Sequence, residues 1–205
     1  MDPSYPEMLD KLRALRESAD PKDRSWYTSF VFFQAKETAE SLAEVEQRTG
    51  MPVPPELKVL LLDVGGFCFP MHVAGFALTF HTHAPYPRPF GGLADLLHAR
   101  WVWKETRDPE NFPEDDIARP NANFVCFALC DLDDDSAEHY FYDRNGNFGV
   151  LHYDQNYRDR KAVDYLYELC KGVNSRPPMT LEEVLAKPLR DCLYVEENDE
   201  NDDSA

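Results

Sequence analysis

Two histidines, His81 and His83, have the spacing that most directly suggests chemistry in this sequence. They lie in residues 76–83, the best strand candidate of their region. On a β-strand, residues i and i+2 project from the same face about 7 Å apart, so both imidazoles could reach one metal ion. A second pair, His139 and His152, would face each other across the hairpin predicted below, but no third ligand lies nearby in the sequence.

Together with Gly75, the first pair forms a Gly-x5-His-x-His pattern, which resembles the opening of the cupin metal motif. That motif continues with a glutamate shortly after the second histidine, whereas this chain has Pro87 and Arg88 there and lacks the second cupin motif. We therefore expect no metal, no other cofactor and no catalytic residue. A small cupin-like metal-dependent enzyme that uses His81 and His83 remains the alternative.

An acidic cluster lies between two predicted strands. Such carboxylates suit a divalent cation or a basic partner, although a solvated turn has the same composition. We predict a partner-binding surface from this cluster and from two tryptophans in a long segment before it, and its residues are Asp131, Asp133, Asp134, Asp135, Glu138, Trp101 and Trp103.

The strands around this cluster are indicated by a hairpin signal. Residues 138–143 and 147–153 flank Asn145-Gly146, the dipeptide favoured in a two-residue type I′ turn. That turn pairs Phe141 with Val150. Residues 123–130 form a further strand candidate of high apolar content.

Apolar residues recur at helical spacing in several other segments. We expect helices near residues 8–15, 37–49, 55–64, 91–104, 160–172 and 180–187. Gly50 suits the end of the second, Pro55 the start of the third, and Gly65-Gly66 its stop. We expect residues 1–35 to form an N-terminal helical arm outside the main domain, 36–195.

The charge balance excludes several classes of function. The 205 residues include 21 lysines and arginines against 38 aspartates and glutamates, a formal net charge of −17. Binding nucleic acid or anionic lipid requires a basic surface, so we expect neither as a partner. No apolar run is long enough to cross a membrane, and five scattered cysteines fit reduced thiols, so we expect a cytoplasmic protein. Residues 196–205 are acidic throughout and are expected to be a disordered tail.

The order of these features resembles the SUKH superfamily. A helix that ends in Glu-Val-Glu-Gln-Arg-Thr-Gly, residues 44–50, leads into Met-Pro-Val-Pro-Pro-Glu, residues 51–56. The sequence Leu-Lys-Val-Leu-Leu-Leu-Asp-Val-Gly-Gly follows at residues 57–66. Residues 124–130, 139–143 and 149–154 resemble the central hairpin of the family, so the resemblance covers roughly residues 36–172.

This resemblance implies an α+β fold, in which helices pack on a central, mostly antiparallel sheet. It also implies a non-catalytic binding role. Many bacterial members look like immunity proteins that neutralise toxins, often nucleases, and fungal members are regulatory scaffolds. A basic toxin would be attracted electrostatically to an acidic inhibitor. We therefore expect a cytosolic immunity protein with a basic toxin domain as its partner, and a regulatory scaffold as a further alternative.

Overall fold

The computed structural model describes residues 4–17, 32–68, 76–78, 91–92, 122–131, 136–154, 164–165, 168–169 and 171–202. Its helices in these ranges are α1 (Tyr5–Glu17), α2 (Ala39–Thr49), α3 (Pro55–Asp63) and α8 (Leu181–Asp202). Its strands are β1 (Phe32–Phe33), β2 (Phe67–Cys68), β3 (Phe76–Leu78), β4 (Gly91–Gly92), β5 (Phe124–Asp131), β6 (Ser136–Asp143) and β7 (Phe148–Asp154). The predicted α+β class is confirmed.

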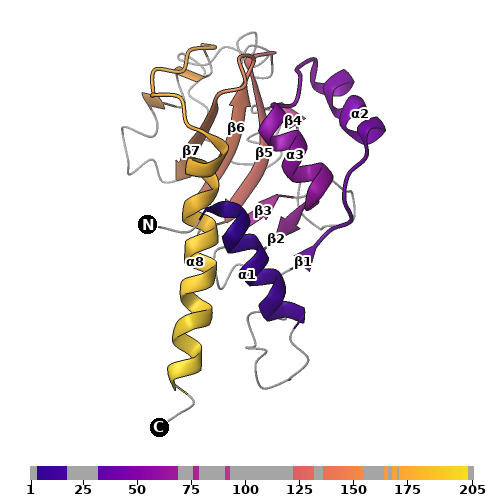
Figure 1. The fold of residues 1–205 in the computed structure, drawn as a ribbon. Coiled ribbons are helices and arrows are strands. Elements are labelled where there is room, and N and C mark those ends of the chain that lie inside the picture. The colour runs from indigo at the N-terminus through magenta and orange to yellow at the C-terminus, as the bar shows by residue number, and fades with distance from the viewer. Residues whose placement is uncertain are drawn as a thin grey trace.

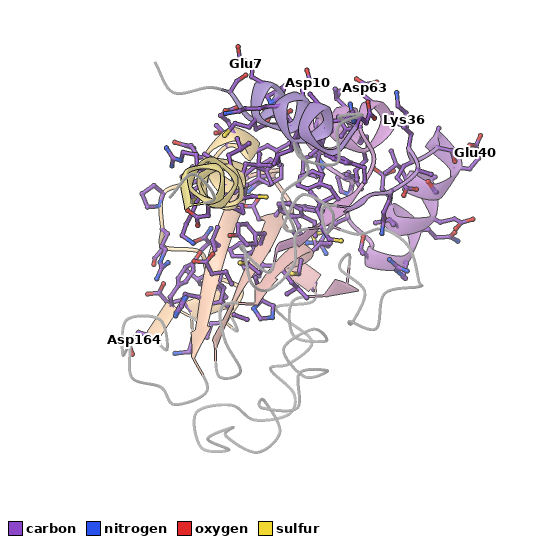
Figure 2. All side chains as sticks on the ribbon, turned by 90° about the horizontal axis from the view of Figure 1, so that it is seen from below. Glu7, Asp10, Lys36, Glu40, Asp63 and Asp164 are labelled. Carbon is purple, nitrogen blue, oxygen red and sulfur yellow. The ribbon has the colours of Figure 1, made fainter. Side chains whose placement is uncertain are left out.

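All strands join one antiparallel sheet in the order β1-β2-β3-β5-β6-β7, and β4 also pairs with β5. The helices α1, α2, α3 and α8 all lie on one side of this sheet (Figures 1 and 2). The helix predicted over 91–104 cannot begin at residue 91, because Gly91 and Gly92 form β4 opposite Cys126 and Val125. Residues 164–165 and 168–169 are helical, as expected for the segment 160–172.

The main hydrophobic core lies between the sheet and the helices. The sheet contributes Val125, Phe127, Tyr140 and Tyr142 among others, and the aromatic ring of Phe127 packs against those of Tyr142 and Phe148. Helix α1 contributes Met8, Leu9 and Leu12, each at most 1% exposed. It also packs along α8, and the Tyr5 N–H donates to Glu182 Oε1 at 2.8 Å. Helix α1 therefore shares the core of the sheet and the other helices.

The opposite face of the sheet is also buried. Leu129, His139 and Leu151 occupy neighbouring positions on β5, β6 and β7, and each is at most 4% exposed. Both faces of these strands are therefore buried, which explains why β6 shows so little alternation of apolar and polar residues in the sequence. The register shifts between Cys126 and Ala128, so that Phe127 is the extra residue of a β-bulge.

The predicted two-residue turn is wrong by one residue. Asp143 N–H bonds to the Asn147 carbonyl, and Gly146, with φ of 81°, donates to the Asp143 carbonyl, which closes a three-residue loop. The Asp143 carboxylate favours this loop because it accepts the Asn145 and Asn147 N–H groups at 2.8 and 2.9 Å. Phe141 consequently pairs with Gly149 instead of Val150.

The helix predicted to stop at residue 187 continues as α8 through Pro188. Its start is as expected, because Thr180 and Glu183 form a reciprocal capping box. Proline removes the bond to the Val184 carbonyl and costs about 3 kcal/mol in a helix interior. Burial of the next apolar residues, Leu189, Cys192 and Leu193, offsets that cost. The structure also places residues 196–202 of the expected disordered tail within α8.

Candidate protein-binding surface

The structure describes only part of the predicted partner-binding residues. Trp101, Trp103, Asp133, Asp134 and Asp135 lie outside the described residues, and so do His81 and His83. Asp131 is the last residue of β5 and pairs with Ala137. Glu138 is the one member of the predicted surface whose side-chain contacts are described.

Glu138 joins the sheet to α8. Its Oε2 accepts the Tyr140 hydroxyl at 2.7 Å and lies 3.6 Å from Lys187 Nζ, which also lies 3.4 Å from Asp191 on α8. Burial raises the pKa of Tyr140, and the adjacent carboxylate raises it further. Burial alone would lower the pKa of Lys187, but Glu138 and Asp191 outweigh it and raise that pKa. Only 14% of the Glu138 side chain is exposed, so its described contacts connect β6 to α8 within the protein.

The histidine pair predicted across the hairpin does not form. The one-residue change in register places His139 opposite Leu151, and His152 opposite Glu138. His139 is fully buried, whereas His152 is partly exposed. Within the described ranges, no group of three or more histidine, cysteine, aspartate or glutamate side chains is arranged to hold a metal ion.

Exposed carboxylates lie instead along the outer side of the helix layer. Figure 2 shows Glu7 and Asp10 of α1, Asp63 of α3 and Glu40 of α2 along this side, with Lys36 between the last two. Glu56 of α3 lies close enough to Tyr5 of α1 for its charge to help raise the pKa of that hydroxyl, although burial contributes more. We call Glu7, Asp10, Glu40, Glu56 and Asp63 the acidic helix surface; all five are exposed.

This surface is acidic because its cations are fewer and partly neutralised. Within residues 4–17 and 32–68, which contain α1, α2 and α3, acidic residues outnumber basic ones by nine to six. Lys58 Nζ lies 2.6 Å from Glu46 Oε1, and Arg13 lies over the Phe33 ring and 3.8 Å from Asp10. Hydrogen bonds from Ser4 lower the pKa of Glu7, and hydrogen bonds from its own backbone N–H and from the Thr38 side chain lower that of Glu40. Both carboxylates therefore stay ionised at neutral pH.

The step between α2 and α3 fixes the centre of this surface. Gly50 ends α2 in the left-handed conformation, with φ of 66°, and the chain turns through Met51 to Pro54. Glu46 Oε1 accepts the Val53 N–H at 2.8 Å while it also contacts Lys58, so one carboxylate ties the connector to both helices. Proline at the first position of α3 loses no helical hydrogen bond.

The end of α3 is held as tightly as its start. Gly65 has φ of 89°, and a Cβ there would lie 2.7 Å from the Gln34 carbonyl oxygen. At Gly66, a Cβ would lie 2.6 Å from the Leu78 carbonyl oxygen. The Glu37 N–H donates to the Leu61 carbonyl at 3.0 Å. The backbone after α3 therefore passes between the segment that contains Gln34 and strand β3, which contains Leu78. Only glycine permits so close an approach on both sides.

Helix α3 is apolar on its outer side as well as its inner side. Leu57, Leu60 and Leu61 are buried in the core. Val59 and Leu62 are 55% and 37% exposed, and Pro55 is exposed in line with them at positions i, i+4 and i+7. The sequence shows the signal for this feature, since the run 59–62 is apolar without interruption, but we did not predict an exposed side.

Comparisons with known proteins found no family model, no curated protein and no solved structure that matches this chain. Among the described helices, none is both long enough and apolar enough to pass through a bilayer.

Proposed function

We propose that this chain is a non-catalytic binding protein of the SUKH type, and that it serves as a cytosolic immunity protein for a basic toxin domain. The observation that carries the proposal is the acidic helix surface, which lies on α1 and on the helix–proline–helix frame of α2 and α3. Residues 44–66, which carry the resemblance, build that frame through Glu46, Gly50 and Gly65.

The charge supports a basic toxin as the target. A formal net charge of −17 attracts a cationic domain from a distance and repels nucleic acid, the substrate of many basic toxins. Exposed carboxylates that remain ionised at neutral pH would pair with the lysines and arginines that such a toxin uses to bind phosphates. Binding there would cover the toxin's own substrate site, which is sufficient for neutralisation.

The direct test is calorimetry of the purified chain against the toxin encoded beside its gene. We expect a dissociation constant well below micromolar and loss of toxin activity in the complex. Asp63→Lys should weaken binding, because it reverses a charge on the acidic helix surface. Asp164→Lys is the matched control, since Asp164 is also exposed but lies on the far side of the molecule in Figure 2.

Two outcomes would contradict the proposal. The immunity role fails if no neighbouring toxin binds at micromolar concentration, and a gene neighbourhood without toxins would favour the regulatory scaffold. Equal weakening by Asp63→Lys and Asp164→Lys would remove the acidic helix surface from the account, because only the overall charge would then matter. The cupin-like alternative depends on His81 and His83, which lie outside the described ranges.

A further inference from the structure

The exposed side of α3 is unusual for a helix on the surface of a protein. A helix that packs on a core normally has polar residues on its solvent side. Here Pro55, Val59 and Leu62 follow one line along the outer side of a helix of nine residues. The line extends over about 10 Å at a rise of 1.5 Å per residue. We call these three residues the α3 stripe.

The α3 stripe is held rigidly. The contacts of Glu46 with Val53 and Lys58 hold the start of the helix. The close approach of Gly65 to the Gln34 carbonyl oxygen holds its end. The inner residues Leu57 and Leu61 are fully buried. A partner that binds here therefore loses little free energy in ordering this side of the interface.

Charges at both ends of the α3 stripe indicate what kind of partner fits. Glu56 follows Pro55 and Asp63 follows Leu62, and both carboxylates are exposed. The cation in the middle of the helix, Lys58, is already paired with Glu46. A second copy of this chain would bring the same carboxylates and another net charge of −17 to the contact, which opposes self-association.

We propose that the α3 stripe is the centre of the contact surface, and that its occupant is a basic protein segment with apolar residues at its middle and lysine or arginine at its rim. This inference rests on the proposed function and deepens it by naming the contact residues. Apolar anchors at the centre of an interface, surrounded by complementary charge, supply most of the binding free energy in protein complexes.

The test uses a synthetic amphipathic helical peptide made only of leucine and lysine, with the full chain labelled for NMR. We expect the peptide to shift the signals of Val59 and Leu62 and to leave Val173 unchanged. Val59→Lys should weaken the peptide's binding about tenfold, the effect of losing an anchor worth about 1.4 kcal/mol. Val173→Lys is the matched control, because Val173 is 53% exposed and the variant adds the same charge. Its effect should stay below about twofold.

The measurements separate the possible failures. Equal weakening by Val59→Lys and Val173→Lys, or no binding of the peptide, would overturn the proposed surface. A wild-type dimer that Val59→Lys converts to a monomer in sedimentation would show a second copy as the occupant and would also overturn it. If Val59→Lys unfolds, Val59→Ser replaces it in the same comparison, because serine removes the anchor without adding charge.

The neighbouring toxin gives an independent arm. If Val59→Lys leaves toxin binding unchanged, the proposed immunity function stands, but the α3 stripe is not the centre of the contact surface. Conversely, peptide binding that depends on Val59 would stand even if no neighbouring toxin binds, so the two proposals can fail separately.

Discussion

Glu46 is the residue on which the connection between α2 and α3 depends. Its carboxylate accepts the Val53 N–H and contacts Lys58, so one side chain satisfies a connector amide and a lysine from the next helix. We predict that Glu46→Ala lowers the free energy of unfolding by about 1–2 kcal/mol. Glu44→Ala, on the exposed side of the same helix, should change it by less than about 0.5 kcal/mol. Urea unfolding measures both, and equal losses would contradict this role.

The same residue predicts a dependence on pH. The hydrogen bond with Lys58 lowers the pKa of Glu46, more than its partial burial raises it. The folded pKa therefore lies below the unfolded value of about 4.3, and the contribution to stability is complete above that value. It is lost as the pH falls through the lowered pKa. The difference in unfolding free energy between wild type and Glu46→Gln should therefore shrink from pH ~7 to pH ~3. A constant difference would show that the charge is unimportant.

Gly50 and Gly65 show two different reasons why a position requires glycine, a left-handed backbone conformation and a close approach of other backbone atoms. Both have positive φ, but a Cβ at Gly50 would meet nothing within 4 Å, whereas at Gly65 it would meet backbone oxygens. Gly50→Ala should therefore cost about 1 kcal/mol, the strain of the left-handed conformation alone. Gly65→Ala should cost at least about 1 kcal/mol more, because backbone must also move. Thermal and urea unfolding of the two variants provide the comparison, and similar losses would contradict the close approach.

At the scale of elements, we expect the two halves of α8 to contribute differently to stability. Its described buried residues end at Leu193, and the acidic run that follows has no basic residue in its last turn, where a cation would favour the helix dipole. We predict that removal of residues 196–205 leaves the unfolding midpoint unchanged, whereas Leu189→Ala costs about 2–4 kcal/mol. Circular dichroism melts measure both. A large loss on truncation would mean that the acidic half also stabilises the core.

The elements themselves were largely predictable, and their exact pairings were not. Periodicity and capping residues located α1, α2, α3 and the start of α8. The hairpin register was missed because the Asp143 side chain selects a longer loop than Asn145-Gly146 alone indicates. The sequence does not predict that α8 continues through Pro188. This continuation depends on the burial of Leu189 against residues distant in the chain, and local sequence rules do not take such burial into account.

The candidate surface was harder to predict than the fold. The cluster of acidic residues predicts a binding role for Glu138 in the sequence. Its ion-pair partner, Lys187, lies far along the chain, so the contact between β6 and α8 is seen only in the structure. Two members of the α3 stripe, Val59 and Leu62, lie in the uninterrupted apolar run 59–62. Sequence alone does not distinguish a helix buried on all sides from one with an exposed side.

At the scale of the whole molecule, the net charge should govern the speed of recognition. Attraction between a chain of charge −17 and a basic partner acts over about 10 Å at 0.1 M salt and fades as salt rises. We predict that the association rate with the proposed toxin partner falls at least about tenfold between ~0.02 M and ~0.5 M salt, while the dissociation rate changes less. Stopped-flow mixing measures both rates. An association rate independent of salt would contradict electrostatic attraction.

The packing of α1 on α8 has a consequence for how the protein is made. Met8 and Leu9 share a core with Leu185 and Leu189, and the Tyr5 N–H bonds to Glu182, so these contacts span more than 170 residues. During synthesis, α1 emerges from the ribosome before α8, so its apolar side stays uncovered until α8 has followed. Such distant contacts slow folding and leave the nascent chain open to aggregation. The core therefore closes only after α8 has been translated.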